Sequence, residues 1–211
     1  MKEERKYTEQ EKKRLKEFGE MTEKLKKEGY EKHDLTMGVL SANIFALVFF
    51  AIFALIFCLL FYIQGYDFEL FSESTSIFEC IIYLVVLLVS VVIHELIHGI
   101  TFATFAENHF KYVHFGFIKE SLTPYCTCTE PLKKYQIILA MAMPGIVLGL
   151  IPSIISLFNG SFTLLFYGLI MLGSAGGDFT IIYLILKNPS KKKDVIYRDH
   201  PTEVGAVMFD R

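Results

Sequence analysis

Residues Ser90–Thr104, SVVIHELIHGITFAT, carry an H-E-x-x-H motif inside a long apolar run. The two histidines of the motif, His94 and His98, are four residues apart, so a helix places both imidazoles on one face, where they can hold one metal ion. Glu95, which follows the first histidine, can take a proton from a metal-bound water. Because no other charge interrupts the run, we expect the motif to lie within a membrane-spanning helix.

The composition indicates an integral membrane protein. Of the 211 residues, 53% are hydrophobic and 20 are phenylalanine, which exceeds the apolar share of roughly 45–50% in a typical globular domain. Cys58 and Cys80 lie in or beside apolar runs, where cysteine is usually a packing residue. Cys126 and Cys128 form a C-x-C that is poorly placed for a mutual disulfide, and it is a weak signal for metal binding.

Four apolar segments predict an all-α membrane protein with about four transmembrane helices, since about 20 apolar residues suffice for each span. The segments cover residues 39–63, 77–106, about 135–158 and about 162–186. They form the main part of a predicted membrane domain, 37–190. A charged head, 1–36, with a thin helical apolar stripe precedes this domain, and a polar tail, 191–211, follows it.

The distribution of Lys and Arg predicts the orientation of the spans. All 21 basic residues fall in the head, in the loop 107–134 or after residue 186, and the other two loops contain none. Basic residues favour the cytoplasmic side of a membrane, and four spans place these three segments on one side. We therefore expect both termini in the cytoplasm.

Four ionisable side chains remain deep within the apolar segments, and they are His94, Glu95, His98 and Asp178. An ionisable group costs several kcal/mol in hydrocarbon unless it is paired or bound to a metal. At a rise of about 1.5 Å per residue, Asp178 lies within roughly one helical turn of the histidines in depth. His94, His98 and Asp178 are therefore candidate zinc ligands, and Glu95 is the candidate general base.

Other interpretations of these groups stay open. They could form a buried polar network that only joins helices, or a proton or ion pathway. Asp178 could also support a histidine instead of binding the metal itself.

Two backbone features lie near the predicted site. Pro144 and Gly145 occur at a similar depth in the third span, where proline removes a helix hydrogen bond and glycine permits close approach, so they either kink the helix or shape the site. Gly176 and Gly177 precede Asp178, and we expect them both to allow tight packing and to loosen the helix so that Asp178 can turn toward the metal.

The loop 107–134 is predicted to be cytoplasmic and to contain one or two short strands. Residues 112–117 alternate weakly between apolar and polar, and residues 122–129 are rich in Thr, Tyr and Cys. An exposed strand edge here could bind an unwound substrate by strand addition. An ordinary loop that covers the site is an equal alternative.

The motif, together with an aspartate two spans later, resembles the site-2 protease class of intramembrane zinc metalloproteases. The sequence is still more similar to the small membrane zincin peptidases, a bacterial domain family. That similarity lies in HELIHG (94–99), a K-Y-x-x-F-G-like stretch (111–116), Pro-Gly in the next span and a Gly-Gly-Asp element. It covers about residues 37–190.

The resemblance implies that His94, His98 and Asp178 bind zinc and that Glu95 is the catalytic base. It departs at the third ligand, because the site-2 class often has Asp-Gly where this chain has Gly-Gly-Asp-Phe. The implied function is that of a zinc-dependent metalloendopeptidase in a bacterial plasma membrane. Its expected partners are membrane lipid and a membrane-protein or peptide substrate, with no nucleic acid.

The alternative is a non-catalytic membrane protein, either a pseudoprotease or a protein that handles metal ions or protons. A pseudoprotease should lack Glu95 or a ligand, and this chain retains all of them. A transporter should offer a polar path through the outer half of the membrane, where the sequence offers little beyond Ser90. The sequence leaves the substrate and the oligomeric state open.

Overall fold

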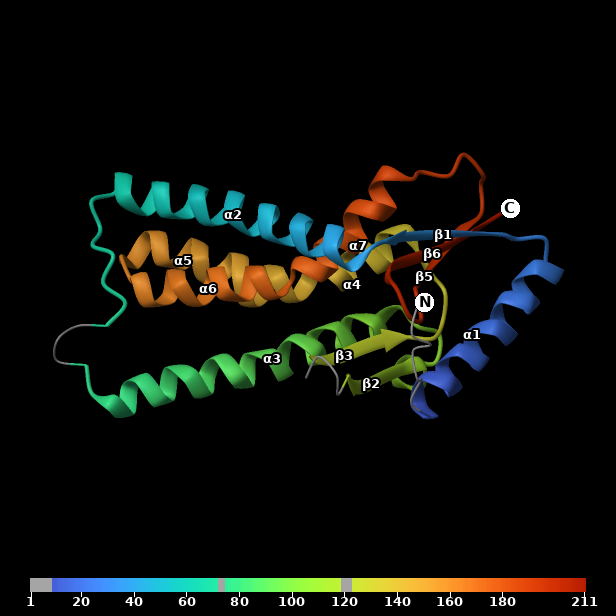
Figure 1. Ribbon diagram of the computed structural model, residues 1–211, viewed down its shortest axis with the longest axis horizontal. Coiled ribbons are helices and arrows are strands. Elements are labelled where there is room, and N and C mark those ends of the chain that lie inside the picture. Colours follow the sequence, from blue (N-terminus) through green and yellow to red (C-terminus); the bar gives the residue numbers. More distant parts are fainter. Residues whose placement is uncertain (1–8, 72–74, 119–122) are drawn as a thin grey trace, which may run out of the picture.

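A computed structural model describes residues 9–71, 75–118 and 123–211 of the chain. Long helices run side by side over most of the molecule, and a small sheet with helix α1 (Glu9–Lys27) closes one end (Figure 1). The sheet contains strands from both the beginning and the end of the chain. The two ends of the described chain therefore meet at the same end of the helix bundle.

Three helices are long and apolar enough to cross a membrane. They are α2 (Val39–Ile63), α3 (Ile77–Phe105) and a rod built from α4 (Lys134–Pro144), η2 (Gly145–Leu150) and α5 (Ile151–Asn159). A further pair, α6 (Phe162–Ser174) and α7 (Gly176–Lys187), passes the same test jointly but is bent by 51°. The four predicted apolar segments are all helical, and the chain has up to four spans if the bent pair is one of them.

The rod is irregular at the position of Pro144 and Gly145. Residues 145–150 form a π-helix directly after the proline, and the rod then continues as α5. Proline cannot donate the usual backbone hydrogen bond, so the helix changes here from the α to the π pattern of hydrogen bonds and continues. π-helical turns are often found at functional sites.

The chain is mostly helical, but the prediction of an all-α protein is wrong because the structure contains two antiparallel sheets. The larger has the order β1-β6-β5-β4, and its strands are β1 (Glu31–Met37), β6 (Val204–Asp210), β5 (Val195–Asp199) and β4 (Leu132–Lys133). In the smaller sheet β2 (Val113–Ile118) pairs with β3 (Thr123–Cys128), after the short 3₁₀-helix η1 (His109–Tyr112). Strands β2 and β3 lie in the loop 107–134, where one or two short strands are predicted.

The strands in the head and the tail were not predicted, and the reason is physical. In β1 only Leu35 is buried, so the strand shows no apolar alternation. It is held by pairing with β6 from Glu31 opposite Asp210 to Met37 opposite Val204. Partners so far apart along the chain do not appear in any local sequence window. The predicted helix in the head is confirmed by α1. The division of the chain into a head, 1–36, a membrane domain, 37–190, and a tail, 191–211, remains a prediction.

The larger sheet lies between α1 and the ends of the membrane helices. Along β6, Phe209 packs with Phe18 of α1, and the neighbouring Met208 belongs to a cluster that contains Phe102 of α3. Successive residues of a strand point to opposite faces, so β6 joins the two layers. The sheet thus brings the C-terminal strands next to α3, α4 and α7.

Candidate metal centre

Helix α3 turns both histidines of the motif toward the interior of the bundle. His94 and His98 are buried, with 7% and 4% of their surface exposed, and their ring centroids are 4.9 Å apart. Leu96 and Ile100 on the same helix are 46% and 56% exposed. One face of α3 therefore serves the site, and the other is exposed.

Asp178 reaches the histidines from the first turn of α7, just after the bend. The Nε2 atom of His94 lies 3.1 Å from Asp178 Oδ2, and Nε2 of His98 lies 3.2 Å from Asp178 Oδ1. One candidate ligand atom from each of the three residues lies within 4.8 Å of the others. The structure thus brings together three side chains that the sequence selected from two separate helices.

A backbone carbonyl of α4 holds the ring of His98. The Nδ1 atom lies 2.8 Å from the oxygen of Ala140, and because a carbonyl only accepts, Nδ1 must carry the proton. In a regular helix this carbonyl would accept from the residue four positions later, which is Pro144, and proline has no N–H. The N–H of the next residue, Gly145, donates to the carbonyl of Ala142 and not to that of Ala140. Pro144 therefore leaves one carbonyl open to the histidine.

The resulting geometry fits a metal ion. With its proton on Nδ1, a neutral His98 turns the lone pair of Nε2 toward a carboxylate oxygen of Asp178, and these electron pairs repel unless a cation or a proton lies between them. Two imidazole nitrogens and one carboxylate are a typical zinc donor set, and a ligating histidine usually donates its other N–H to an oxygen. The Nδ1 atom of His94 has no hydrogen-bond partner among the described residues.

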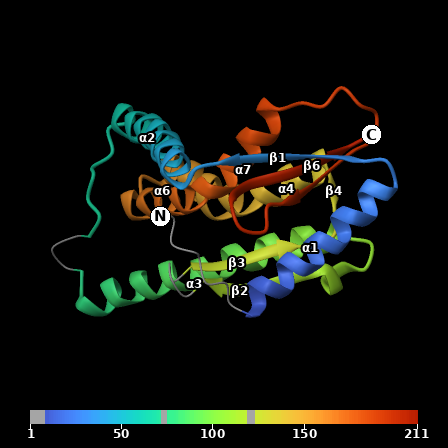
Figure 2. The same ribbon diagram turned by 45° about the vertical axis from the view of Figure 1, so that its right-hand side comes forward.

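Glu95 is half-buried beside this cluster, at the contact between α3 and β3. Its carboxylate faces the backbone N–H of Cys126 on β3. The hairpin β2–β3 packs along α3 (Figure 2). Gly99 permits this contact, since a Cβ there would lie 2.2 Å from the ring of Phe115. The residue after the second histidine is thus small because a strand lies on it.

The sequence of residues 87–192 matches a family described as "Putative zincin peptidase", over half of the chain. The chain belongs to this family. No curated protein and no solved structure matches the chain significantly. All four residues of the candidate site lie within the matched region, so the zincin family supports a zinc metallopeptidase, and with the apolar helices it supports one in a membrane.

The glycines of this zincin differ in their packing. A Cβ on Gly145 would lie 2.9 Å from the ring of Phe179, and a Cβ on Gly176 would lie 2.6 Å from the Cβ of Ala46. These two glycines let α7 approach η2 and α2 closely. Nothing among the described residues lies within 4 Å of a Cβ placed on Gly177, so packing does not require that glycine.

Two polar contacts near the site were missed by sequence reasoning. The hydroxyl groups of Ser90 and Tyr167 are 2.8 Å apart and link α3 to α6, one helical turn before His94. The Thr127 hydroxyl of β3 donates to Oδ2 of Asp199 on β5, at 3.2 Å. A tyrosine in an apolar run and an aspartate in a polar tail carry no local signal of either contact.

Asp199 lies close enough to the metal centre to interact electrostatically with His98 and Asp178. Burial raises the pKa of Asp199 to about 6, and the Thr127 hydrogen bond and the positive charge of Arg198 oppose that rise. Its Oδ1 atom is shielded from solvent and has no hydrogen-bond partner among the described residues. Strand β5 thus places the carboxyl group of Asp199, which lies outside the matched region 87–192, next to the metal centre.

Cys126 and Cys128 are free thiols on β3. Burial raises the pKa of both, to about 11 for Cys128. Within residues 9–71, 75–118 and 123–211, neither thiol joins a group of side chains that could hold a metal. These cysteines are therefore not candidates for the zinc of the zincin site.

Another group of this kind, Glu31, His33 and Asp210, lies in the larger sheet. The Nζ atom of Lys192 lies 2.6 Å from Glu31 and 3.0 Å from Asp210. The lysine ammonium already supplies the positive charge for these carboxylates, so a second metal ion is not needed there.

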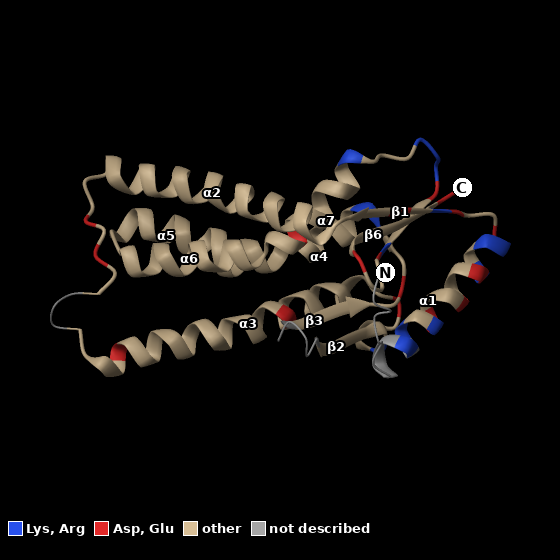
Figure 3. Ribbon diagram, in the orientation of Figure 1, with Lys and Arg blue, Asp and Glu red and all other residues tan. Residues whose placement is uncertain are grey.

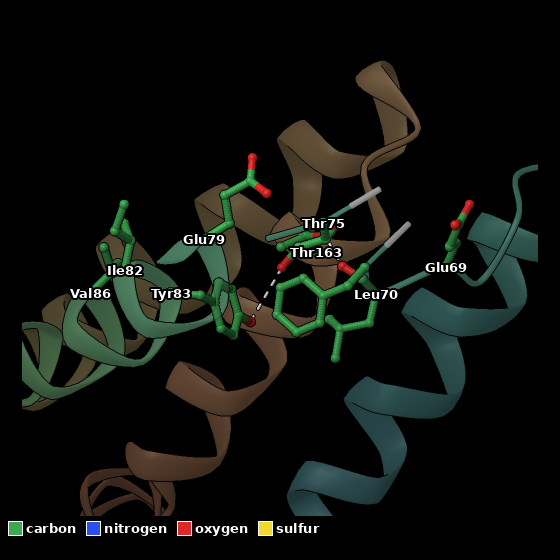
Figure 4. A pocket seen from close by; sticks show the side chains of 9 residues that line it. Glu69, Leu70, Thr75, Glu79, Ile82, Tyr83, Val86 and Thr163 are labelled. Carbon is green, nitrogen blue, oxygen red and sulfur yellow. Dashed lines mark hydrogen bonds between the residues drawn. The ribbon is translucent and has the colours of Figure 1, made fainter. Parts of the chain in front are cut away.

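A cavity of about 430 Å³ lies at the opposite end of α3 (Figure 4). It is lined by Glu69, Leu70, Phe71, Thr75, Glu79, Ile82, Tyr83, Val86 and Thr163. None of the predicted site residues is part of this lining, so the cavity is separate from the metal centre.

Proposed function

We propose that this protein is an intramembrane zinc metallopeptidase that hydrolyses peptide bonds of membrane-associated proteins or peptides. The observation that carries the proposal is the cluster of His94, His98 and Asp178 beside Glu95, within a bundle of apolar helices. Ionisable groups in such a setting are unfavourable unless they are bound or paired. A zinc ion accounts for the three ligands, and the site-2 protease-like arrangement accounts for Glu95.

The chemistry follows from the positions of the side chains. A zinc ion held by His94, His98 and Asp178 would polarise the scissile carbonyl and lower the pKa of a bound water. Glu95 accepts the proton of the attacking water and passes it to the leaving amine. The Ala140 carbonyl keeps the imidazole of His98 in one tautomer and one orientation.

The same proposal places the chain in a bacterial plasma membrane with four spans, α6 and α7 together forming the bent fourth. Lys and Arg gather at the end with α1 and the sheet, while acidic residues mark the opposite loop (Figure 3). Basic residues favour the cytoplasmic side. Both termini and the nearer mouth of the site then face the cytoplasm, from which water and substrate segments reach Glu95.

A non-catalytic role is the second candidate. The contacts of 3.1 and 3.2 Å between Asp178 and the two histidines are also those of a buried cluster that handles protons or carries a metal. A pseudoprotease would use the same cluster only to bind a substrate helix. In each of these alternatives the cluster still binds a metal ion or a proton, but Glu95 does not take part in hydrolysis.

The experiment combines metal content with hydrolysis of a fluorogenic mixed-sequence peptide in detergent. Wild type, Glu95→Gln, Asp178→Ala and the loop control Asp67→Asn are compared. We expect equimolar zinc in all but Asp178→Ala, and hydrolysis only in wild type and the control. Wild-type protein that binds no zinc contradicts the proposal. Zinc-loaded wild type that hydrolyses no faster than Glu95→Gln supports the non-catalytic role.

A further inference from the structure

The contact between Asp199 and Thr127 connects the larger sheet to strand β3, which packs on α3. Asp199 lies on β5, where it pairs with Ala206, a fully buried residue of β6. Its Oδ2 atom accepts the hydroxyl of Thr127, which is 5% exposed. The preceding residue on β3 is Cys126, whose N–H faces the carboxylate of Glu95. A continuous set of contacts therefore runs from the sheet to the proposed base.

Two adjacent charged residues of β5 serve opposite faces of the strand. Arg198 points to α1, where its guanidinium lies 5.3 Å from the ring centroid of Phe18. Asp199 points to β3 and the metal centre. A carboxylate with one oxygen that is shielded from solvent and has no partner among the described residues is unfavourable for stability, and a threonine contact alone would not require it. Such a residue is expected where function needs it.

We propose that Asp199 is a positioning residue of the peptidase: by accepting the Thr127 hydroxyl, it fixes β3 on α3 and so holds the Cys126 N–H against Glu95. The inference rests on the proposed function of the same site. It makes the C-terminal strands, which lie outside the matched family region, part of the working enzyme. Loss of the contact should loosen β3 and leave Glu95 misplaced, while the three zinc ligands remain in position.

The first test is a double-mutant cycle read with the fluorogenic peptide. Asp199→Ala and Thr127→Val should each lower kcat about 10-fold with little change in KM, and both should retain zinc. The double variant should be no slower than either single one, because both remove the same contact. Asp199→Asn and Thr127→Ser restore an acceptor and a hydroxyl, and each should recover most of the lost rate.

The matched control is Asp34→Asn, an exposed carboxylate on β1 of the same sheet, which should have no effect. Additive losses in the double variant would overturn the proposal. So would a wild-type rate in Asp199→Ala, or an Asp199→Asn variant as slow as Asp199→Ala.

The second test does not depend on hydrolysis. Cys126 is next to Thr127, so its alkylation by N-ethylmaleimide, followed by mass spectrometry of the peptide, reports whether β3 stays on α3. Asp199→Ala and Thr127→Val should both speed the reaction several-fold, and Thr127→Ser should not. Unchanged alkylation in both overturns the positioning role even if the enzyme hydrolyses peptides. Faster alkylation in a protein without zinc-dependent hydrolysis supports the contact and rejects only the peptidase.

Discussion

The two halves of α3 have similar apolar sequences but very different surroundings. In the first half Phe78, Ile82 and Leu88 are 72%, 61% and 62% exposed. In the second half Phe102 is 1% exposed and His98 is 4% exposed. Helix α3 contacts α4, η1, β2 and β3. The hydrogen bond of His98 to Ala140 and the close approach of Phe115 to Gly99 place contacts with α4 and β2 on the second half.

This difference shows which part of the helix is built to hold a site. A metal site needs ligands fixed by packing and by hydrogen bonds to their neighbours. Only the second half supplies these, with the carbonyl of Ala140 on His98 and the hairpin over Gly99. In the proposed membrane setting, lipid covers the first half.

The largest difference between the halves should appear when a matched pair of phenylalanines is truncated. Phe102→Ala should lower the free energy of unfolding by about 3–5 kcal/mol, as is typical of a buried aromatic residue. Phe78→Ala should change it by less than about 0.5 kcal/mol, as is typical of a surface site. Unfolding by SDS in mixed micelles measures both. Equal losses would mean that the two halves are equally packed.

Removal of a ligand from the metal centre should weaken zinc binding strongly, whereas removal of a carboxylate from the first half of α3 should not. A four-ligand zinc site is worth about 10–16 kcal/mol, so one ligand of four contributes about 2.5–4 kcal/mol. Asp178→Ala should therefore weaken zinc binding by about 100- to 1000-fold in competition with a chromogenic chelator. Glu79→Gln, at the start of α3, serves as the control. A zinc affinity of Asp178→Ala equal to that of wild type would exclude this aspartate as a ligand.

Asp199 should give the packed end a dependence of stability on pH. Its folded pKa of about 6 lies above its ordinary value of 3.8, so the unfolded chain loses this proton first as pH rises. Below about pH 4 the carboxyl group is neutral in both states and does not lower the free energy of unfolding. Between about pH 4 and pH 6 the free energy of unfolding decreases as pH rises. The loss reaches up to about 3 kcal/mol at pH 7.

Asp199→Asn removes this ionisation. In zinc-free protein it should be more stable than wild type at pH 7, and the difference should vanish near pH 4. Unfolding curves in chelator at both pH values test this. A difference that is the same at both would exclude ionisation of Asp199 as its source.

Pro144 should have a smaller effect, through the orientation of His98. Pro144→Ala restores a backbone N–H that competes with the histidine for the Ala140 carbonyl. Loss of such a partner of a metal ligand typically lowers metal affinity by about 10–100-fold. Pro152→Ala, at the start of α5 in the same rod, is the matched control and should leave zinc affinity unchanged. Equal effects of the two substitutions would show that Pro144 acts only through helix shape.

Much of the helical part of the fold could be predicted from the sequence, because a membrane span is a local property of about 20 residues. The candidate ligands could be selected for the same reason, since charged groups in apolar runs are conspicuous. The structure brings His94, His98 and Asp178 together, although the sequence predicted only a loosened helix at Gly176 and Gly177 and not the bend before α7.

The remaining features depend on contacts between distant residues. The charged strand β1 forms because β6 lies beside it. The contact of Thr127 with Asp199 joins residues whose surroundings appear only after the sheet has formed. The role of Pro144 likewise becomes visible only when the Ala140 carbonyl is seen to accept from His98.

X-ray absorption at the zinc edge of the purified, zinc-loaded protein tests the central claim most directly. The account predicts a spectrum fitted by two imidazole nitrogens and by oxygen donors, without sulfur. Sulfur ligation at about 2.3 Å, which would place the metal on Cys126 or Cys128, would contradict it.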